Sequence, residues 1–165
     1  MSALSSVHVL LVDDNPNMRA IVAAMLKSVG VGRLSEAEDG VVALELLRRE
    51  AIDIAIVDFR MKPMDGAAFT RAVRSEGDSA NPYLPVIMMT GHSEKSRVTE
   101  ARDAGVTEFV AKPVKAQTLL TRIEAVILRP RPFVRSPSYF GPDRRRTGTK
   151  DYAGPFRRAE DGVVD

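Results

Sequence analysis

Five polar residues that could take part in chemistry stand at the ends of short apolar runs. Asp13 and Asp14 follow the first run, and Asp58 closes a run nearer the middle of the chain. Thr90 and Lys112 stand at the ends of two later runs. If these runs are parallel strands of one sheet, their carboxyl ends meet at a single edge, where open α/β sheets bind ligands.

The residue types at these positions predict phosphate chemistry with Mg²⁺ as cofactor. Carboxylates gathered in one cleft raise one another's pKa values unless a cation lies among them, and ligands that are all oxygen atoms suit Mg²⁺. Lysine adds a fixed positive charge and threonine a hydroxyl donor, the groups that phosphoryl oxygens need. A carboxylate can be the nucleophile by forming an aspartyl phosphate. Asp58, on the central strand, is the predicted acceptor.

Alternating apolar runs and helical patterns predict the elements that bring these residues together. Strands are predicted over about residues 8–12, 34–37, 54–58, 86–90 and 107–111, and helices over about 18–29, 41–49, 67–74, 94–104 and 115–128. Asn17 and Ser93 are predicted to cap the first and fourth helices. This alternation predicts an α/β fold: a five-stranded parallel sheet, (βα)5 and doubly wound, with helices on both faces.

Simpler explanations exist for each polar residue taken alone. An aspartate after a strand can cap a loop, a lysine can lie on the surface and a threonine can lie at the edge of the core. Their joint occurrence at the ends of four of the five predicted strands favours the chemical interpretation. A phosphatase with an aspartyl nucleophile is a rival function, but that class requires a second acid two residues after the nucleophile, where this chain has Arg60.

The amino-acid composition excludes several other classes of chemistry and of metal site. The chain has no cysteine, which excludes disulfides, thiol nucleophiles and Cys-ligated zinc. Its two histidines, His8 and His92, are too few for a His-rich metal site. No apolar run approaches the roughly 20 residues of a membrane span, so we expect no membrane insertion and a cytoplasmic protein. Residues 1–128 carry 15 Lys+Arg against 17 Asp+Glu and residues 129–165 carry 9 against 5, so the basic character belongs to the tail.

Together these motifs resemble the receiver domain of two-component response regulators, the fold of the chemotaxis regulator. The resemblance covers about residues 6–128, and it rests on Asp13-Asp14, the run D-F-R-M-K-P-M-D-G from Asp58, Thr90-Gly91, Phe109 and Lys112-Pro113. It implies a flavodoxin-like topology. It also implies a stand-alone regulator that accepts a phosphoryl group from a histidine kinase or a phosphotransfer protein. Such a chain hydrolyses its own phosphate and is not an enzyme in the usual sense.

The resemblance also implies a role for each site residue. Asp14 and Asp58 would bind Mg²⁺ directly, Asp13 would act mostly through water, and the backbone carbonyl of Arg60 would complete the protein ligands. Lys112 would pair with a phosphoryl oxygen, and its bond to the following proline would be cis.

Thr90 and Phe109 would form the switch that responds to phosphorylation. Their movement would shift the face formed by the fourth and fifth helices between two populations. That face would contact an output protein that the sequence does not identify, and a homodimer through the same face is a further expectation.

Two positions that flank the phosphoryl site vary within this family, and here they hold Arg60 and His92. One hypothesis is that the bulk of these side chains slows the loss of phosphate. The alternative is that both face solvent and have no kinetic role.

The tail, residues 129–165, is rich in proline and arginine and is predicted to be extended or partly disordered. It has no segment the size of a helix-turn-helix, so DNA binding is disfavoured. Three interpretations stay open. The tail could be solvated, it could pack on its own domain or on a second copy, or Arg144, Arg145 and Arg146 could bind an anionic partner. In the last case the chain would be an adaptor for a cyclic dinucleotide, RNA or an acidic protein.

Overall fold

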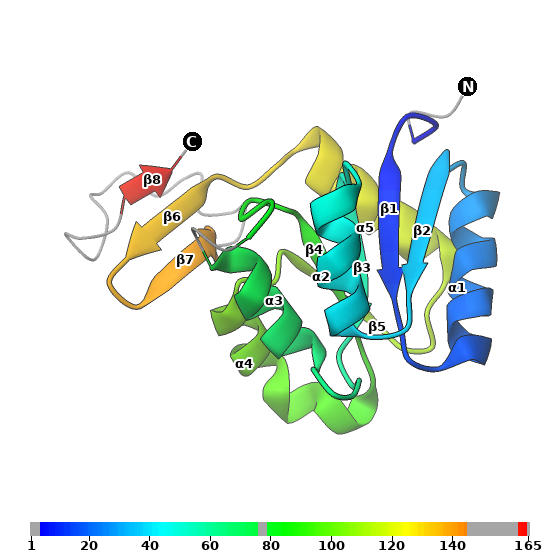
Figure 1. The fold of residues 1–165 in the computed structure, drawn as a ribbon, viewed down its shortest axis with the longest axis horizontal. Coiled ribbons are helices and arrows are strands. Elements are labelled where there is room, and N and C mark those ends of the chain that lie inside the picture. Colours follow the sequence, from blue (N-terminus) through cyan, green and yellow to red (C-terminus); the bar gives the residue numbers. More distant parts are fainter. Residues whose placement is uncertain (1–3, 76–78, 145–161, 165) are drawn as a thin grey trace.

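The computed structural model describes residues 4–75 and 79–144, together with the backbone of residues 162–164. Strands and helices alternate along residues 8–128 (Figure 1). In chain order they are β1 (His8–Val12), α1 (Pro16–Ser28), β2 (Arg33–Ala37), α2 (Gly40–Arg49), β3 (Ile54–Asp58), α3 (Gly66–Arg74), β4 (Val86–Thr90), the 3-10 helix η1 (His92–Arg97), α4 (Val98–Ala104), β5 (Glu108–Ala111) and α5 (Ala116–Leu128).

The five strands form one parallel sheet in the order β2-β1-β3-β4-β5. Helices α1 and α5 pack together on one face, and α2, α3 and α4 follow one another across the other. The strand order therefore reverses direction between β1 and β3, which is the switch point at which doubly wound sheets bind ligands. The predicted flavodoxin-like fold is confirmed.

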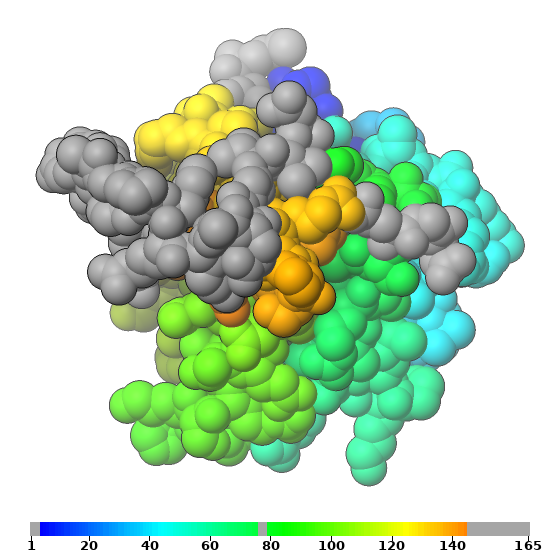
Figure 2. All heavy atoms as spheres, turned by 90° about the vertical axis from the view of Figure 1, so that its left-hand side faces the viewer, coloured from blue at the N-terminus to red at the C-terminus, as the bar shows by residue number. Residues whose placement is uncertain are grey.

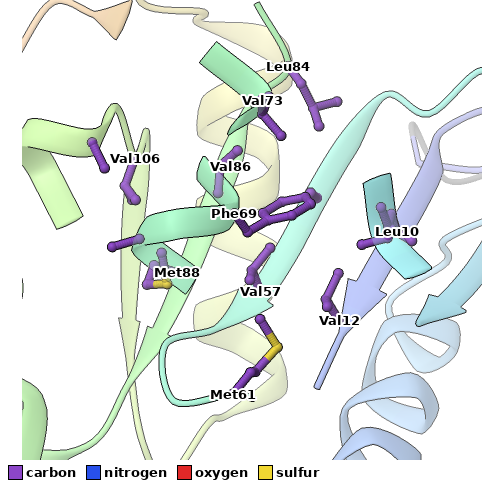
Figure 3. Packing of buried hydrophobic residues seen from close by; sticks show 14 of the residues in the cluster. Leu10, Val12, Val57, Met61, Phe69, Val73, Leu84, Val86, Met88 and Val106 are labelled. Atoms are coloured by element: carbon purple, nitrogen blue, oxygen red, sulfur yellow. The ribbon is translucent and has the colours of Figure 1, made fainter. Parts of the chain in front are cut away.

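Burial on both faces explains why the central strands are so apolar. Every residue of β1, β3 and β4 is buried. Alternate residues supply two cores, so that Val57 of β3 packs with α3 while Ile56 packs on the α1 and α5 side. Figure 3 shows Phe69 of α3 next to Val57. Full burial of such a side chain stabilises the fold by about 1.5–3 kcal/mol.

Both predicted helix caps are wrong. Asn15, not Asn17, caps α1, because its side chain accepts hydrogen bonds from the backbone N–H groups of Asn17 and Met18 at 2.9 and 3.1 Å. Proline follows Asn15 at the first helical position, where it has no hydrogen bond to lose. Ser93 lies inside η1 rather than before a helix, and Gly91 is the residue that precedes this turn.

The segment after α5 departs from the prediction of an irregular tail. Residues Phe133–Ser136 form β6 and Tyr139–Pro142 form β7, an antiparallel hairpin. A third strand, β8 (Gly162–Val164), pairs antiparallel with β6. The hairpin lies beside α3 and α4, on the side of the domain away from β2 (Figures 1 and 2).

Aromatic packing and arginine contacts explain why this segment is ordered. The rings of Phe133 and Phe140 lie 5.0 and 5.6 Å from the ring of Tyr83, between centroids. Arg144 forms an ion pair of 2.6 Å with Asp103 of α4. Of the interpretations of the tail, packing on its own domain is therefore the one that holds for the segment through residue 144.

Arg145 and Arg146 lie outside the described residues. Within the described part of the chain, no helix is long and apolar enough to cross a membrane.

Candidate functional site

Strand register brings the predicted site residues to one edge of the sheet. Val12 pairs with Val57, which places Asp13 beside the end of β3 at Asp58. Thr90 ends the neighbouring strand β4, and its carbonyl accepts a hydrogen bond of 2.8 Å from the backbone N–H of Lys112. Strand register therefore places Asp13, Asp58, Thr90 and Lys112 at the same edge of the sheet.

The acidic residues and the lysine line one open cavity of about 350 Å³. Within it, carboxylate oxygens of Asp13, Asp14 and Asp58 all lie within 4.8 Å of one another. Nζ of Lys112 is 2.5 Å from Oδ1 of Asp58. The cavity thus combines clustered negative charge with the ammonium group of Lys112, which pairs with Asp58.

Burial controls the ionisation of this cluster. Desolvation raises the pKa of Asp58 to about 6, although the hydrogen bond and charge of Lys112 act in the opposite direction. Burial also raises the pKa of Asp13. Both carboxyl groups are therefore poised to be stabilised in their charged forms by a cation placed among them.

The donor set fits Mg²⁺. Oδ2 of Asp13 is buried and accepts no hydrogen bond within the described residues, whereas Oδ1 accepts one of 2.9 Å from the backbone N–H of Asn15. A buried carboxylate oxygen without a donor is costly unless a metal or water meets it. Asp13, Asp14 and Asp58 could therefore hold the ion. A contribution from the backbone carbonyl of Arg60 stays a prediction.

Proton competition at this site leads to a testable pH dependence. Because the metal binds the carboxylate form, protonation of Asp58 below about pH 6 should weaken Mg²⁺ binding. We expect the apparent affinity to fall about tenfold between pH 7 and pH 5, as measured by isothermal titration calorimetry. The same titration on Asp58→Asn should show weaker binding with a shallower pH dependence. An affinity that is constant across this range would contradict the assignment.

A carboxylate that the sequence analysis did not select also lines the cavity. Glu94 is buried, and its Oε1 accepts a hydrogen bond of 2.8 Å from the backbone N–H of Gly91. Its Oε2 lies 3.2 Å from Nη2 of Arg60. Glycine has no side chain to act as a cap, but the Glu94 carboxylate accepts from the N–H of the residue three positions earlier, as in one half of a capping box, and this spacing is the signal that could have found the contact. His92, by contrast, is exposed and is not among the residues that line the cavity.

The predicted switch residues lie on neighbouring strands. Thr90 pairs with Ala111, and Phe109 pairs with Met88, two residues before Thr90. Thr90 is buried, whereas Phe109 is half-buried and lines a second cavity, of about 200 Å³, with Arg131 and Arg144 of the C-terminal segment. Movement of these two side chains stays a prediction. The Lys112–Pro113 bond is cis, as the resemblance implied.

A doubly wound sheet whose central strand ends in an aspartate, with an acidic pair and a lysine beside it, is the arrangement of a receiver-type domain. A comparison of the sequence with models of known protein families gives the same class. The family model described as response regulator receiver domain matches residues 9–124, and the chain belongs to this family. The hairpin formed by β6 and β7 lies beyond the matched residues.

Two similar curated proteins are chemotaxis regulators. The chain is 37% identical over 121 residues to chemotaxis protein CheY of Pseudomonas aeruginosa, an alignment that covers 73% of this chain and 96% of the relative. It is 32% identical over 124 residues to chemotaxis protein CheY-3 of Vibrio cholerae, covering 75% of this chain and 94% of the relative.

Solved structures show the same architecture. The crystal structure of the receiver domain of sensor histidine kinase PA1611 from P. aeruginosa, with a magnesium ion coordinated in its active-site cleft, matches with a TM-score of 0.63 and 29% identity over 71% of this chain and 93% of that chain. Chemotaxis protein CheY4 of V. cholerae matches with a TM-score of 0.66 and 30% identity over 73% of this chain and 98% of that chain.

Proposed function

We propose that this chain is a response regulator that accepts a phosphoryl group on Asp58 from a histidine kinase or a phosphotransfer protein and signals through protein contact. The observation that carries the proposal is the setting of Asp58. It ends the central strand, its Oδ1 lies 2.5 Å from Nζ of Lys112, and its carboxylate lies within 4.8 Å of the acidic pair.

Each residue of the site has a distinct role in the proposed phosphoryl transfer. A carboxylate oxygen of Asp58 forms a bond to phosphorus as the phosphorus–nitrogen bond of the donor phosphohistidine breaks, and the electron pair returns to the imidazole. Lys112 neutralises charge on a phosphoryl oxygen, and the Thr90 hydroxyl donates a hydrogen bond to another. Mg²⁺ bound by the acidic cluster would offset the remaining negative charge. The protein is then an acceptor that later hydrolyses its own phosphate, not an enzyme in the usual sense.

The rival functions lack comparable support. The aspartyl phosphatase requires an acid at position 60, and the guanidinium there is directed to Glu94 instead. The adaptor interpretation relies on the arginines of the tail. Arg144 is already engaged, because it pairs with Asp103 at 2.6 Å and lies over the ring of Tyr139 at 4.2 Å.

The C-terminal segment, residues 129–144, also contacts elements of the face through which output is expected. Arg131 lies 3.0 Å from Glu108 of β5, and Arg144 pairs with Asp103 of α4. An output protein, or a second copy of the chain, that contacts this end of the α4 and β5 surface would therefore meet the segment as well.

Incubation with acetyl phosphate and Mg²⁺ tests the proposal. We expect one phosphoryl group per chain by intact mass, stable in acid and labile in base as an acyl phosphate is. Chelation of Mg²⁺ should prevent the uptake. Uptake of no phosphoryl group by the wild-type chain would overturn the proposed function.

A further inference from the structure

An ion pair joins the two loops beside the phosphoacceptor. Arg60 lies in the loop that follows β3, and Ser93 and Glu94 lie in η1, directly after β4. Nη2 of Arg60 is 3.2 Å from Oε2 of Glu94 and donates a hydrogen bond of 3.3 Å to Oγ of Ser93. All three residues line the cavity that contains Asp58. The contact therefore bridges one side of the phosphoryl site.

The two partners differ in how firmly they are held. The side chain of Glu94 is 5% exposed, whereas that of Arg60 is 73% exposed. Glu94 also accepts hydrogen bonds from the Gly91 backbone N–H and the Ser93 hydroxyl, which lower the pKa of its carboxyl group. A side chain fixed in this way can hold a solvated one in place, because the exposed guanidinium otherwise samples many rotamers.

Glycine at position 91 is part of the arrangement. A Cβ there would lie 3.2 Å from Oε1 of Glu94, closer than an ordinary contact, and 3.8 Å from Cδ of Lys112. The absence of a side chain lets the carboxylate approach the backbone of the loop that follows Thr90. Glu94 is thus anchored to the residue that directly follows Thr90.

We propose that Glu94 is a positioning residue that holds the Arg60 guanidinium across the gap between these loops and so limits the access of water to phosphorylated Asp58. In the reaction that is slowed, the oxygen of water bonds to phosphorus as the bond from phosphorus to the Asp58 oxygen breaks. The electron pair restores the carboxylate, and both protons of the water leave on inorganic phosphate as H2PO4−. This inference rests on the proposed function. It assigns the kinetic role to Arg60 through Glu94 and none to His92.

The lifetime of the acyl phosphate tests the inference. Full-length protein is loaded with acetyl phosphate and Mg²⁺, the donor is removed, and the phosphorylated fraction is followed by intact mass. Glu94→Gln keeps the shape of the side chain and an acceptor for the Gly91 N–H but removes the charge that holds Arg60. We expect Glu94→Gln and Arg60→Ala each to shorten the lifetime about threefold or more.

A double variant separates positioning from independent effects. Because both residues act through one contact, Glu94→Gln combined with Arg60→Ala should shorten the lifetime no more than Arg60→Ala alone. His92→Ala is the matched control and should leave the lifetime unchanged. A wild-type lifetime in Glu94→Gln, or effects of the two substitutions that multiply, would overturn the inference.

A second measurement does not depend on phosphorylation. In the NMR spectrum of the unphosphorylated protein, Glu94→Gln should move the Arg60 Nη–H signals to the position of exposed arginines while the Gly91 amide signal stays near its wild-type position. An unmoved Arg60 signal would overturn the bridge. If the wild type takes up no phosphoryl group, the proposed function fails and the lifetime role fails with it. If it is phosphorylated and Glu94→Gln has no effect on lifetime, the inference alone fails.

Discussion

Replacing Asp58 with asparagine is expected to abolish phosphoryl uptake from acetyl phosphate. The amide has nearly the shape of the carboxylate but is not a comparable nucleophile, and it removes one of the acidic groups that could bind Mg²⁺. Because the acceptor is the only group that forms the bond to phosphorus, the loss should be complete rather than partial. Intact mass after incubation with Mg²⁺ and acetyl phosphate measures it.

Asp53→Asn is the matched control for this substitution. Asp53 precedes the same strand at its opposite end, where Oδ2 accepts a hydrogen bond of 2.8 Å from the backbone N–H of His8. An asparagine side chain retains an oxygen that can accept this bond, so uptake should match the wild type. A base-labile phosphate that persists in Asp58→Asn would show that the acceptor is a different residue.

The same variant should also change how stability depends on pH. In the chelated wild type, the pKa of Asp58 is about 6 in the folded chain, above its ordinary value of 3.8. Between these values the folded state binds more protons than the unfolded state, so this group lowers the free energy of unfolding as pH rises through the window. Asp58→Asn removes that contribution. With Mg²⁺ chelated, urea unfolding should show a smaller loss of stability between pH 4 and pH 6 in the variant.

The second large expected effect is on stability, at Arg74. This arginine is 5% exposed at the end of α3. Its Nε and Nη2 donate hydrogen bonds of 3.1 and 2.8 Å to the carbonyl of Gly105, and Nη1 donates one of 3.0 Å to the carbonyl of Pro82. Its guanidinium also lies 5.0 Å from the ring centroid of Phe133 in the C-terminal hairpin. A single side chain thus joins α3, α4, the loop before β4 and β6.

Arg74→Ala is expected to lower the free energy of unfolding by about 3 kcal/mol. Each buried carbonyl left without a donor costs about 1–3 kcal/mol, and the contact with the Phe133 ring and the side-chain packing are lost as well. Burial lowers the pKa of Arg74 to about 10, so release from desolvation offsets part of this loss. The free energy lost with the hydrogen bonds and the ring contact is larger than the free energy gained by removing a buried charge. The net effect is therefore destabilising.

Arg71→Ala is the control, three residues earlier on the same helix. Its side chain is 54% exposed, and its ion pair with Glu100 is 4.0 Å long. Exposed pairs of this kind contribute about 0–1 kcal/mol, so the urea midpoint should hardly move. Equal shifts in the midpoint for the two variants would mean that Arg74 has no special structural role.

The sequence by itself determined the sheet and most of the phosphoryl site. Buried parallel strands appear as apolar runs, and the residues that end such runs must meet at one edge whatever the details of packing. Asp13, Asp58 and Lys112 were predictable for this reason. Asp14 and Thr90 stand at the ends of the first and fourth of these runs, so selecting the residues of the proposed site required no knowledge of long-range contacts.

Only the tertiary structure decided the roles of Glu94, Arg74 and the C-terminal segment. Glu94 becomes part of the site because Arg60, 34 positions earlier, reaches it across two loops. Arg74 is buried because Gly105, with a φ of 107°, brings its carbonyl to the guanidinium. The hairpin gives a weak sequence signal, since its strands are short and β7 ends in proline. Its order depends on rings and arginines that meet α3 and α4. Such contacts join residues that are distant in the sequence, so no local sequence pattern predicts them.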